Sequence, residues 1–81
     1  MIEYQVEVYE DRTEWRRDDK IHREDGPAVE YADGGSKHWY INGKRHREDG
    51  PASEYRDGYK EWLLKGTLQS VTGSIGYEFR I

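Results

Sequence analysis

The heptapeptide HREDGPA occupies residues 22–28 and recurs, letter for letter, at residues 46–52 of this 81-residue chain. We call the two copies motif 1 and motif 2. Their first residues are 24 positions apart, so the chain is a short tandem array, and its repeats have to be identified before any single residue is interpreted. Such an array predicts a fold in which one small unit is used several times.

The repeat extends beyond the motif to a short segment centred on a glutamate, which precedes each tryptophan at a nearly constant spacing. These segments are residues 6–8, 29–31 and 53–55, and the tryptophans that follow them are Trp15, Trp39 and Trp62. The third copy lacks the heptapeptide, as a terminal cap of an array would. We therefore expect one domain over 1–81, with repeat-like units at about 6–28, 29–52 and 53–69 and a closing strand at 76–81.

Aromatic residues are the main source of apolar surface in this chain. Hydrophobic residues make up 33% of it and charged residues 37%, with a mean hydropathy of -1.21, but seven Tyr, three Trp and one Phe raise the aromatic content to 14%. Each large aromatic side chain can bury ~150–250 Å², so we expect a folded protein in which Tyr and Trp replace an aliphatic core. The absence of Cys excludes disulfides and thiolate zinc sites. Without a long apolar run or a signal-peptide pattern, the chain is expected to be cytoplasmic, with no membrane partner.

Alternation and turn signals together predict an all-β fold. Ile2, Tyr4, Val6 and Val8 alternate with polar residues, which is the period of a half-buried strand. Turn residues then recur every few positions, at 10–11, 18–19, 33–35, 42–43, 57–58, 65–66 and 73–76. The prediction is an antiparallel meander of tandem β-hairpin repeats of about 24 residues, with about eight to ten strands in a single twisted or rolled sheet and no substantial helix.

The two-residue loop at Asn42-Gly43 fixes which residues face each other across its hairpin. Counting outward places Ile41 opposite Lys44, Tyr40 opposite Arg45 and Trp39 opposite His46, and the same count places Trp15 opposite His22 and Gln69 opposite Trp62. Each tryptophan of the first two copies therefore meets the first residue of a motif. The alternating residues 77–81 predict a closing strand on an exposed edge of the sheet, for which the first strand is a candidate.

The stretch EYADGGSKHWYINGKRHREDGPA, residues 30–52, resembles the MORN-variant repeats of small proteins from bacteriophages, large DNA viruses and some bacteria. The resemblance covers roughly residues 6–68. It implies hairpin sheets that serve as protein-binding or scaffolding surfaces, and membrane binding is not carried over because the ordinary MORN glycine pattern is only partly present. By analogy, the chain would be a phage product in the host cytoplasm that inhibits a defence enzyme, as anti-CRISPR proteins do.

Two roles follow for the repeat, one structural and one in binding. Trp15, Trp39 and Trp62 persist in all three copies, so we expect them to form, with Tyr31 and Tyr55, an aromatic ladder along one face that holds the hairpins together. The motifs are expected to display the protein-binding residues, which are His22, Arg23, Glu24, Asp25, His46, Arg47, Glu48 and Asp49. Asp25 and Asp49 are also expected to cap turns. Changing Arg23 or Arg47 to Glu should then leave folding nearly intact, because exposed ion pairs contribute little.

The sequence does not support catalysis, a metal site or nucleic-acid binding. His22 and Glu24 share one face of an extended strand while Asp25 points away, and no third type of ligand recurs. Cys is absent, and the serines lie in no nucleophile motif. Acidic residues interrupt the basic clusters in a chain of net charge -4. We therefore expect no enzyme, no cofactor and no nucleic-acid partner.

A protein-interaction module is the function that these observations favour, with a protein partner such as a host defence nuclease or effector complex. Two alternatives remain: a small-ligand or nucleotide binder in which a Trp-His pair stacks on a ring, and a structural or scaffolding repeat protein. A thin sheet leaves an aromatic face exposed unless it rolls up or pairs with another surface. We therefore expect either a rolled sheet or a homodimer, and we favour the dimer.

Overall fold

Short antiparallel strands form the secondary structure, and no helix occurs among the residues that the computed structural model describes, which are 3–32, 34–73 and 78–80. The strands are β1 (Gln5–Val8), β2 (Arg12–Arg17), β3 (Lys20–Ile21), β4 (Val29–Tyr31), β5 (Lys37–His38), β6 (Tyr40–Ile41), β7 (Lys44–Arg45), β8 (Ser53–Glu54), β9 (Lys60–Leu64), β10 (Thr67–Thr72) and β11 (Glu78–Arg80). The predicted all-β class is confirmed. Expectations that rest on Ile2, Asp33, residues 74–77 and Ile81 lie outside the described residues.

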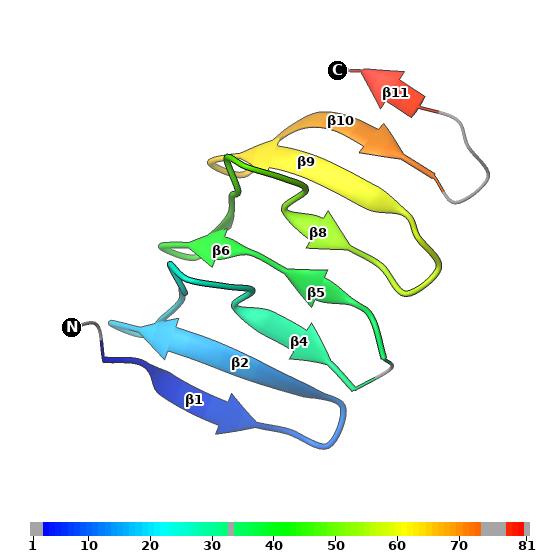
Figure 1. The fold of residues 1–81 in the computed structure, drawn as a ribbon. Coiled ribbons are helices and arrows are strands. Elements are labelled where there is room, and N and C mark those ends of the chain that lie inside the picture. The colour runs from blue at the N-terminus through cyan, green and yellow to red at the C-terminus, as the bar shows by residue number, and fades with distance from the viewer. Residues whose placement is uncertain (1–2, 33, 74–77, 81) are drawn as a thin grey trace.

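The sheet is open, with β1 at one end and β11 at the other (Figure 1). Its strand order is β1-β2-β4-β5-β8-β9-β10-β11, with β3 paired to β2, while β6 and β7 pair with each other in a separate two-stranded sheet. Every pairing is antiparallel, as a meander requires. The closing strand pairs with β10, so the expectation that it would pair with the first strand is wrong.

Three hairpin turns repeat the same backbone geometry. Asp18-Asp19, Asn42-Gly43 and Lys65-Gly66 each place both central residues at positive φ, at 52° and 63°, 51° and 80°, and 50° and 82°. Two consecutive positive φ angles define the type I′ turn, whose twist matches that of the strands it joins. The predicted two-residue loops are confirmed at all three places, and glycine occupies the second position in two of them.

The register of the central hairpin also agrees with the count from its turn. Tyr40 lies opposite Arg45 and Ile41 opposite Lys44. The His46 N–H donates to the Trp39 carbonyl at 3.0 Å, and the His22 N–H donates to the Trp15 carbonyl at the same distance, so both Trp-His pairings are confirmed. In the third copy the prediction is wrong, because a register shift between Leu68 and Ser70 leaves Gln69 unpaired and places Ser70 opposite Trp62.

Each motif is held by its arginine, which stacks on a tryptophan of the same repeat. The Arg47 Cζ lies 3.9 Å from the centre of the Trp39 ring, and the Arg47 guanidinium donates to Asp49 Oδ1, the Pro51 carbonyl and Glu54 Oε2, each at 3.1 Å. Gly50 packs closely against the same guanidinium. A Cβ at that position would lie only 2.8 Å from Arg47 Cζ. The arginine, aspartate, glycine and proline of the motif therefore act together as one folded loop.

Motif 1 repeats this arrangement. Arg23 Cζ lies 4.2 Å from the Trp15 ring centre, and its guanidinium donates to Asp25, the Pro27 carbonyl and Glu30 at 3.1, 3.2 and 3.4 Å. Both motif arginine side chains are only 23% exposed. The expectation that these arginines are exposed is therefore wrong, and the two motif aspartates accept from arginine in place of the predicted turn caps.

The histidine of each motif joins one repeat to the turn of the next. His22 Nδ1 accepts a hydrogen bond from the Asn42 N–H at 2.9 Å, and its Nε2 lies 3.1 Å from Glu24 Oε2. His46 makes the equivalent bond to the Lys65 N–H, also at 2.9 Å. A nitrogen that accepts from a backbone N–H carries no proton, so the proton of a neutral ring sits on Nε2, where it is donated to the glutamate. The motif therefore fastens neighbouring repeats together.

The aromatic residues are divided between two faces of the sheet. His38 and Tyr40 flank Trp39, so they point to the opposite side from it. Tyr31 and Tyr55 contact His38 and therefore lie on that opposite side too. The expected single ladder of three tryptophans with Tyr31 and Tyr55 is wrong in this respect. We call the side with the tryptophans and motifs the motif face, and the side with Tyr31, His38, Tyr40 and Tyr55 the groove face.

Replacing Arg47 with Glu should lower the free energy of unfolding by about 2 kcal/mol or more, because the variant loses the stacking on Trp39 and charge-assisted hydrogen bonds to two carboxylates. Arg56 is the matched control, since it is exposed, and Arg56→Glu should change that free energy by less than about 0.5 kcal/mol. Urea unfolding followed by tryptophan fluorescence measures both. Equal stability of the two variants would show that the motif arginine has no structural role.

Candidate interaction surface

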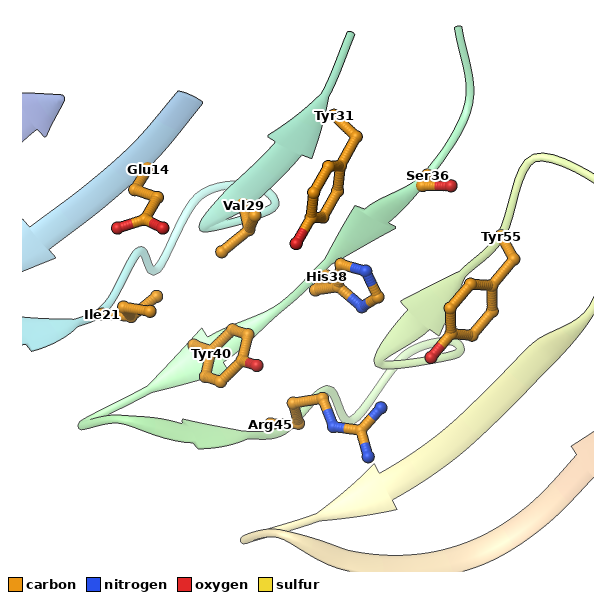
Figure 2. A pocket seen from close by; sticks show the side chains of 9 residues that line it. All are labelled: Glu14, Ile21, Val29, Tyr31, Ser36, His38, Tyr40, Arg45 and Tyr55. Carbon is orange, nitrogen blue, oxygen red and sulfur yellow. The ribbon is translucent and has the colours of Figure 1, made fainter. Parts of the chain in front are cut away.

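A shallow groove of about 490 Å³ crosses the groove face between β2 and the loop before β9 (Figure 2). Because residues of all three repeat units contribute to it, the groove exists only when those units pack side by side. Its lining combines aromatic, charged and aliphatic side chains, which are Glu14, Ile21, Val29, Tyr31, Ser36, His38, Tyr40, Arg45 and Tyr55.

A line of ring contacts runs along this face from one repeat into the next. The Tyr31 and His38 rings meet edge to face with centroids 5.7 Å apart, and His38 meets Tyr55 in the same way at 5.3 Å. Tyr59 continues the line at 5.4 Å from Tyr55. Edge-to-face contacts orient the rings, and the Tyr31 residue remains 38% exposed. The result is an ordered aromatic surface that solvent can reach.

A polar network under the rings fixes their positions. Ser53 is fully buried, and its Oγ lies 2.7 Å from His38 Nδ1 and accepts a hydrogen bond from Arg45 at 2.9 Å. The same Arg45 nitrogen donates to Glu61 Oε1 at 2.7 Å, and the Tyr55 hydroxyl donates to that oxygen at 3.0 Å. Burial, followed by this hydrogen bond, raises the pKa of Tyr55, which favours the protonated hydroxyl that donates to Glu61. No buried side-chain polar atom lacks a partner in the described part of the chain.

The Ser53-His38 pair does not form a nucleophile and base. Ser53 Oγ is enclosed beneath the sheet face, and Arg45 as well as His38 already bonds to it. A nucleophile has to reach the reacting atom of a substrate, which this oxygen cannot do. Sequence reasoning missed the network. Its signal was that Arg45 and Ser53 stand where the preceding repeat has Ile21 and Val29.

The carboxylate of Glu14 lies at one end of the groove, between two arginines. Arg12 Nε donates to one of its oxygens and Arg16 donates to the other, both at 2.7 Å. The hydrogen bond from Arg12, followed by that from Arg16, lowers the pKa of Glu14 although burial opposes the shift. Glu14 and Glu61, the carboxylates that face the groove network, are therefore paired with arginines of the same face.

The motif face brings both motifs around a second groove of about 680 Å³. Its lining includes seven of the eight residues predicted for binding, which are Arg23, Glu24, Asp25, His46, Arg47, Glu48 and Asp49, while His22 is buried beneath. The arginines and histidines turn inward, whereas the Glu48 and Asp49 side chains are 82% and 89% exposed. The motifs thus offer mainly carboxylates to solvent.

The Trp-His pair expected to stack on a ligand ring is already engaged within the fold. Arg47 covers one face of Trp39, and His46 Nδ1 accepts from the Lys65 N–H. Among the described residues, no three His, Asp or Glu side chains converge in a way that could hold a metal ion. The described part of the chain also contains no helix with the length and hydrophobicity needed to cross a membrane.

Comparisons with protein-family models, with curated proteins and with solved structures each return no match. The resemblance to MORN-variant repeats therefore stays a prediction from the sequence.

The arginine pair around Glu14 predicts a specific response to acid. Because the folded-state pKa of Glu14 is lowered, its contribution to stability is present above the ordinary carboxyl pKa of about 4.3 and is lost as the pH falls through the lower folded-state value. Glu14→Gln should therefore be less stable than the wild type at pH 7, and the difference should shrink below about pH 4. Thermal unfolding at several pH values measures it, with exposed Glu10→Gln as the control. A difference that is independent of pH would contradict the assignment.

Proposed function

We propose that this chain is a non-catalytic protein-interaction module whose partner docks on the groove face. The observation that carries the proposal is the line of rings from Tyr31 through His38 and Tyr55 to Tyr59, held in place by a buried polar network and open to solvent along the groove. Tyrosine and arginine are among the residue types that dominate binding energy at protein interfaces. An ordered surface also loses little side-chain entropy when a partner binds.

The dimensions and charge of the groove face support the same proposal. The molecule extends over 38 by 26 Å in its two longest directions, or about 1,000 Å², against the ~800 Å² that each partner buries in a standard interface. Glu14 and Glu61 are already paired with arginines, so a partner that covers them leaves neither carboxylate unpaired. Such a face suits a partner that contributes apolar or aromatic side chains.

The finer proposal concerns the identity of the partner. The resemblance to phage and viral repeat proteins, together with the analogy to anti-CRISPR proteins, supports a host defence nuclease or effector complex that this chain would inhibit. The alternative is that a small ligand binds in the groove. The groove volume of about 490 Å³ lies within the ~300–1,000 Å³ of ligand pockets, but the groove is open on one side. A thermal-shift screen with nucleotides separates the two, because only a bound ligand raises the melting temperature.

Tyr31→Ala should abolish or strongly weaken capture of the partner from host lysate, by at least about thirtyfold if Tyr31 is a hot spot worth ~2 kcal/mol. Tyr9→Ala is the matched control, since Tyr9 is comparably exposed but lies outside the groove, and it should leave capture unchanged. Asp49→Asn tests the motif face. Pull-down with mass spectrometry, alongside melting temperatures, measures all three. Loss of the partner with Asp49→Asn but not with Tyr31→Ala would move the binding surface to the motif face.

The favoured homodimer stays a prediction, and the groove face is the surface on which a second copy would compete with a partner protein. Light scattering from micromolar to near-millimolar concentration tests it. A dimer that Tyr31→Ala dissociates would assign the groove to self-association and contradict the partner proposal, whereas a monomer would support it.

A further inference from the structure

Strand β1 leaves one edge of the sheet unpaired within the described part of the chain. The Tyr9 N–H donates to the Arg12 carbonyl at 2.7 Å, so Tyr9 is a hydrogen-bonded residue of the β1-β2 ladder. Glu7, two residues before Tyr9 in the chain, lies opposite Glu14 in the same ladder. In an antiparallel ladder, hydrogen-bonded residues alternate with residues whose N–H and C=O groups point away from the partner strand. The backbone groups of Val6 and Val8 therefore point outward from the sheet edge.

This edge lacks three of the features that often prevent strand addition, which are proline, lysine and a bulge. All four residues of β1 are exposed, and the exposed fractions of Val6 and Val8 are 49% and 78%. The strand contains no Pro and no Lys, and its pairing with β2 runs without a register shift. Natural edge strands are commonly blunted by prolines, bulges or charges, and the charges along this edge are acidic. An edge with exposed valines and charges of one sign is a template for a further strand of opposite charge.

The charge of the edge indicates which strand fits. Residues 3–11 contain four acidic residues, Glu3, Glu7, Glu10 and Asp11, and no Lys or Arg. A second copy of β1 would bring like charges together, which is unfavourable between facing strands. A strand with lysine or arginine at alternate positions would instead face Glu3 and Glu7 and place its remaining side chains beside Val6 and Val8.

We propose that β1 is a second interaction site, which accepts an extended, cationic segment of a partner polypeptide as an additional strand of the sheet. The Val6 and Val8 backbone groups supply the hydrogen bonds, the valines supply the apolar contact, and the acidic residues select the charge. The inference does not rest on the groove. Val6 and Val8 share the motif face with Trp15, because Val6 is the direct cross-strand neighbour of that residue.

A short peptide that alternates lysine and valine is the probe. With isotope-labelled protein, its addition should shift the amide signals of Val6 and Val8 and slow their hydrogen exchange. The same peptide with N-methyl groups on alternate backbone nitrogens keeps its charge but loses the donors along one edge, so it should bind roughly tenfold more weakly, as expected when two backbone hydrogen bonds are lost. A peptide that alternates glutamate and valine should not bind, and Glu7→Lys should weaken binding of the lysine peptide.

Equal binding of the N-methylated peptide would overturn the proposal, because attraction would then be electrostatic only. Peptide-induced protection confined to the backbone amides of the motifs would also overturn it. So would protection of the Val6 and Val8 amides that rises with protein concentration without peptide, because the edge would then bind a second copy. Tyr31→Ala should bind the peptide as well as the wild type. This variant separates failure of the edge site from failure of the groove proposal.

Discussion

The stacking of a motif arginine on the tryptophan of its own repeat is the interaction on which the rest of the structure depends. A chain with 33% hydrophobic residues has few aliphatic side chains to bury. The buried hydrophobic residues in the described part of the chain are two alanines, two valines and one leucine. The guanidinium of Arg47 covers Trp39 and at the same time satisfies two carboxylates and a carbonyl. This folds the motif into a loop that presents His46 to the turn of the next repeat. The same seven residues thus stabilise a repeat and add side-chain hydrogen bonds to the strand pairing that joins successive repeats.

That arrangement also explains why the two faces differ. The motif arginines fold over Trp15 and Trp39, whereas Tyr31, His38 and Tyr40 line a groove that is open to solvent. Strand alternation sends His38 and Tyr40 to the side opposite Trp39, and Tyr31 and Tyr55 join them on the groove face. We therefore propose that binding takes place on the groove face and at the free edge of β1, and that the motifs serve mainly in folding.

The sequence predicted what depends on local chemistry. Asn42-Gly43 predicted a type I′ turn, and the turn predicted the pairing of Tyr40 with Arg45, because a two-residue loop leaves one register. The role of the motif could not be predicted this way, since the contact of Arg47 with Trp39 depends on how the loop folds back over the sheet. The bulge at Gln69 and the Arg45-Ser53-Glu61 network also escaped prediction, because each is a departure of one copy from the repeat.

Native-state hydrogen exchange at the Asn42 amide tests most directly whether the motif fastens neighbouring repeats, because this amide donates to His22 Nδ1 across the repeat boundary. The amide should be protected in the wild type and lose protection in His22→Leu. In His22→Asn it should stay largely protected, since the side-chain carbonyl oxygen of the new residue can replace the acceptor. The Lys65 amide, which bonds to His46, is the internal reference. An Asn42 amide that exchanges freely in the wild type, or equally fast in all three proteins, would contradict the account.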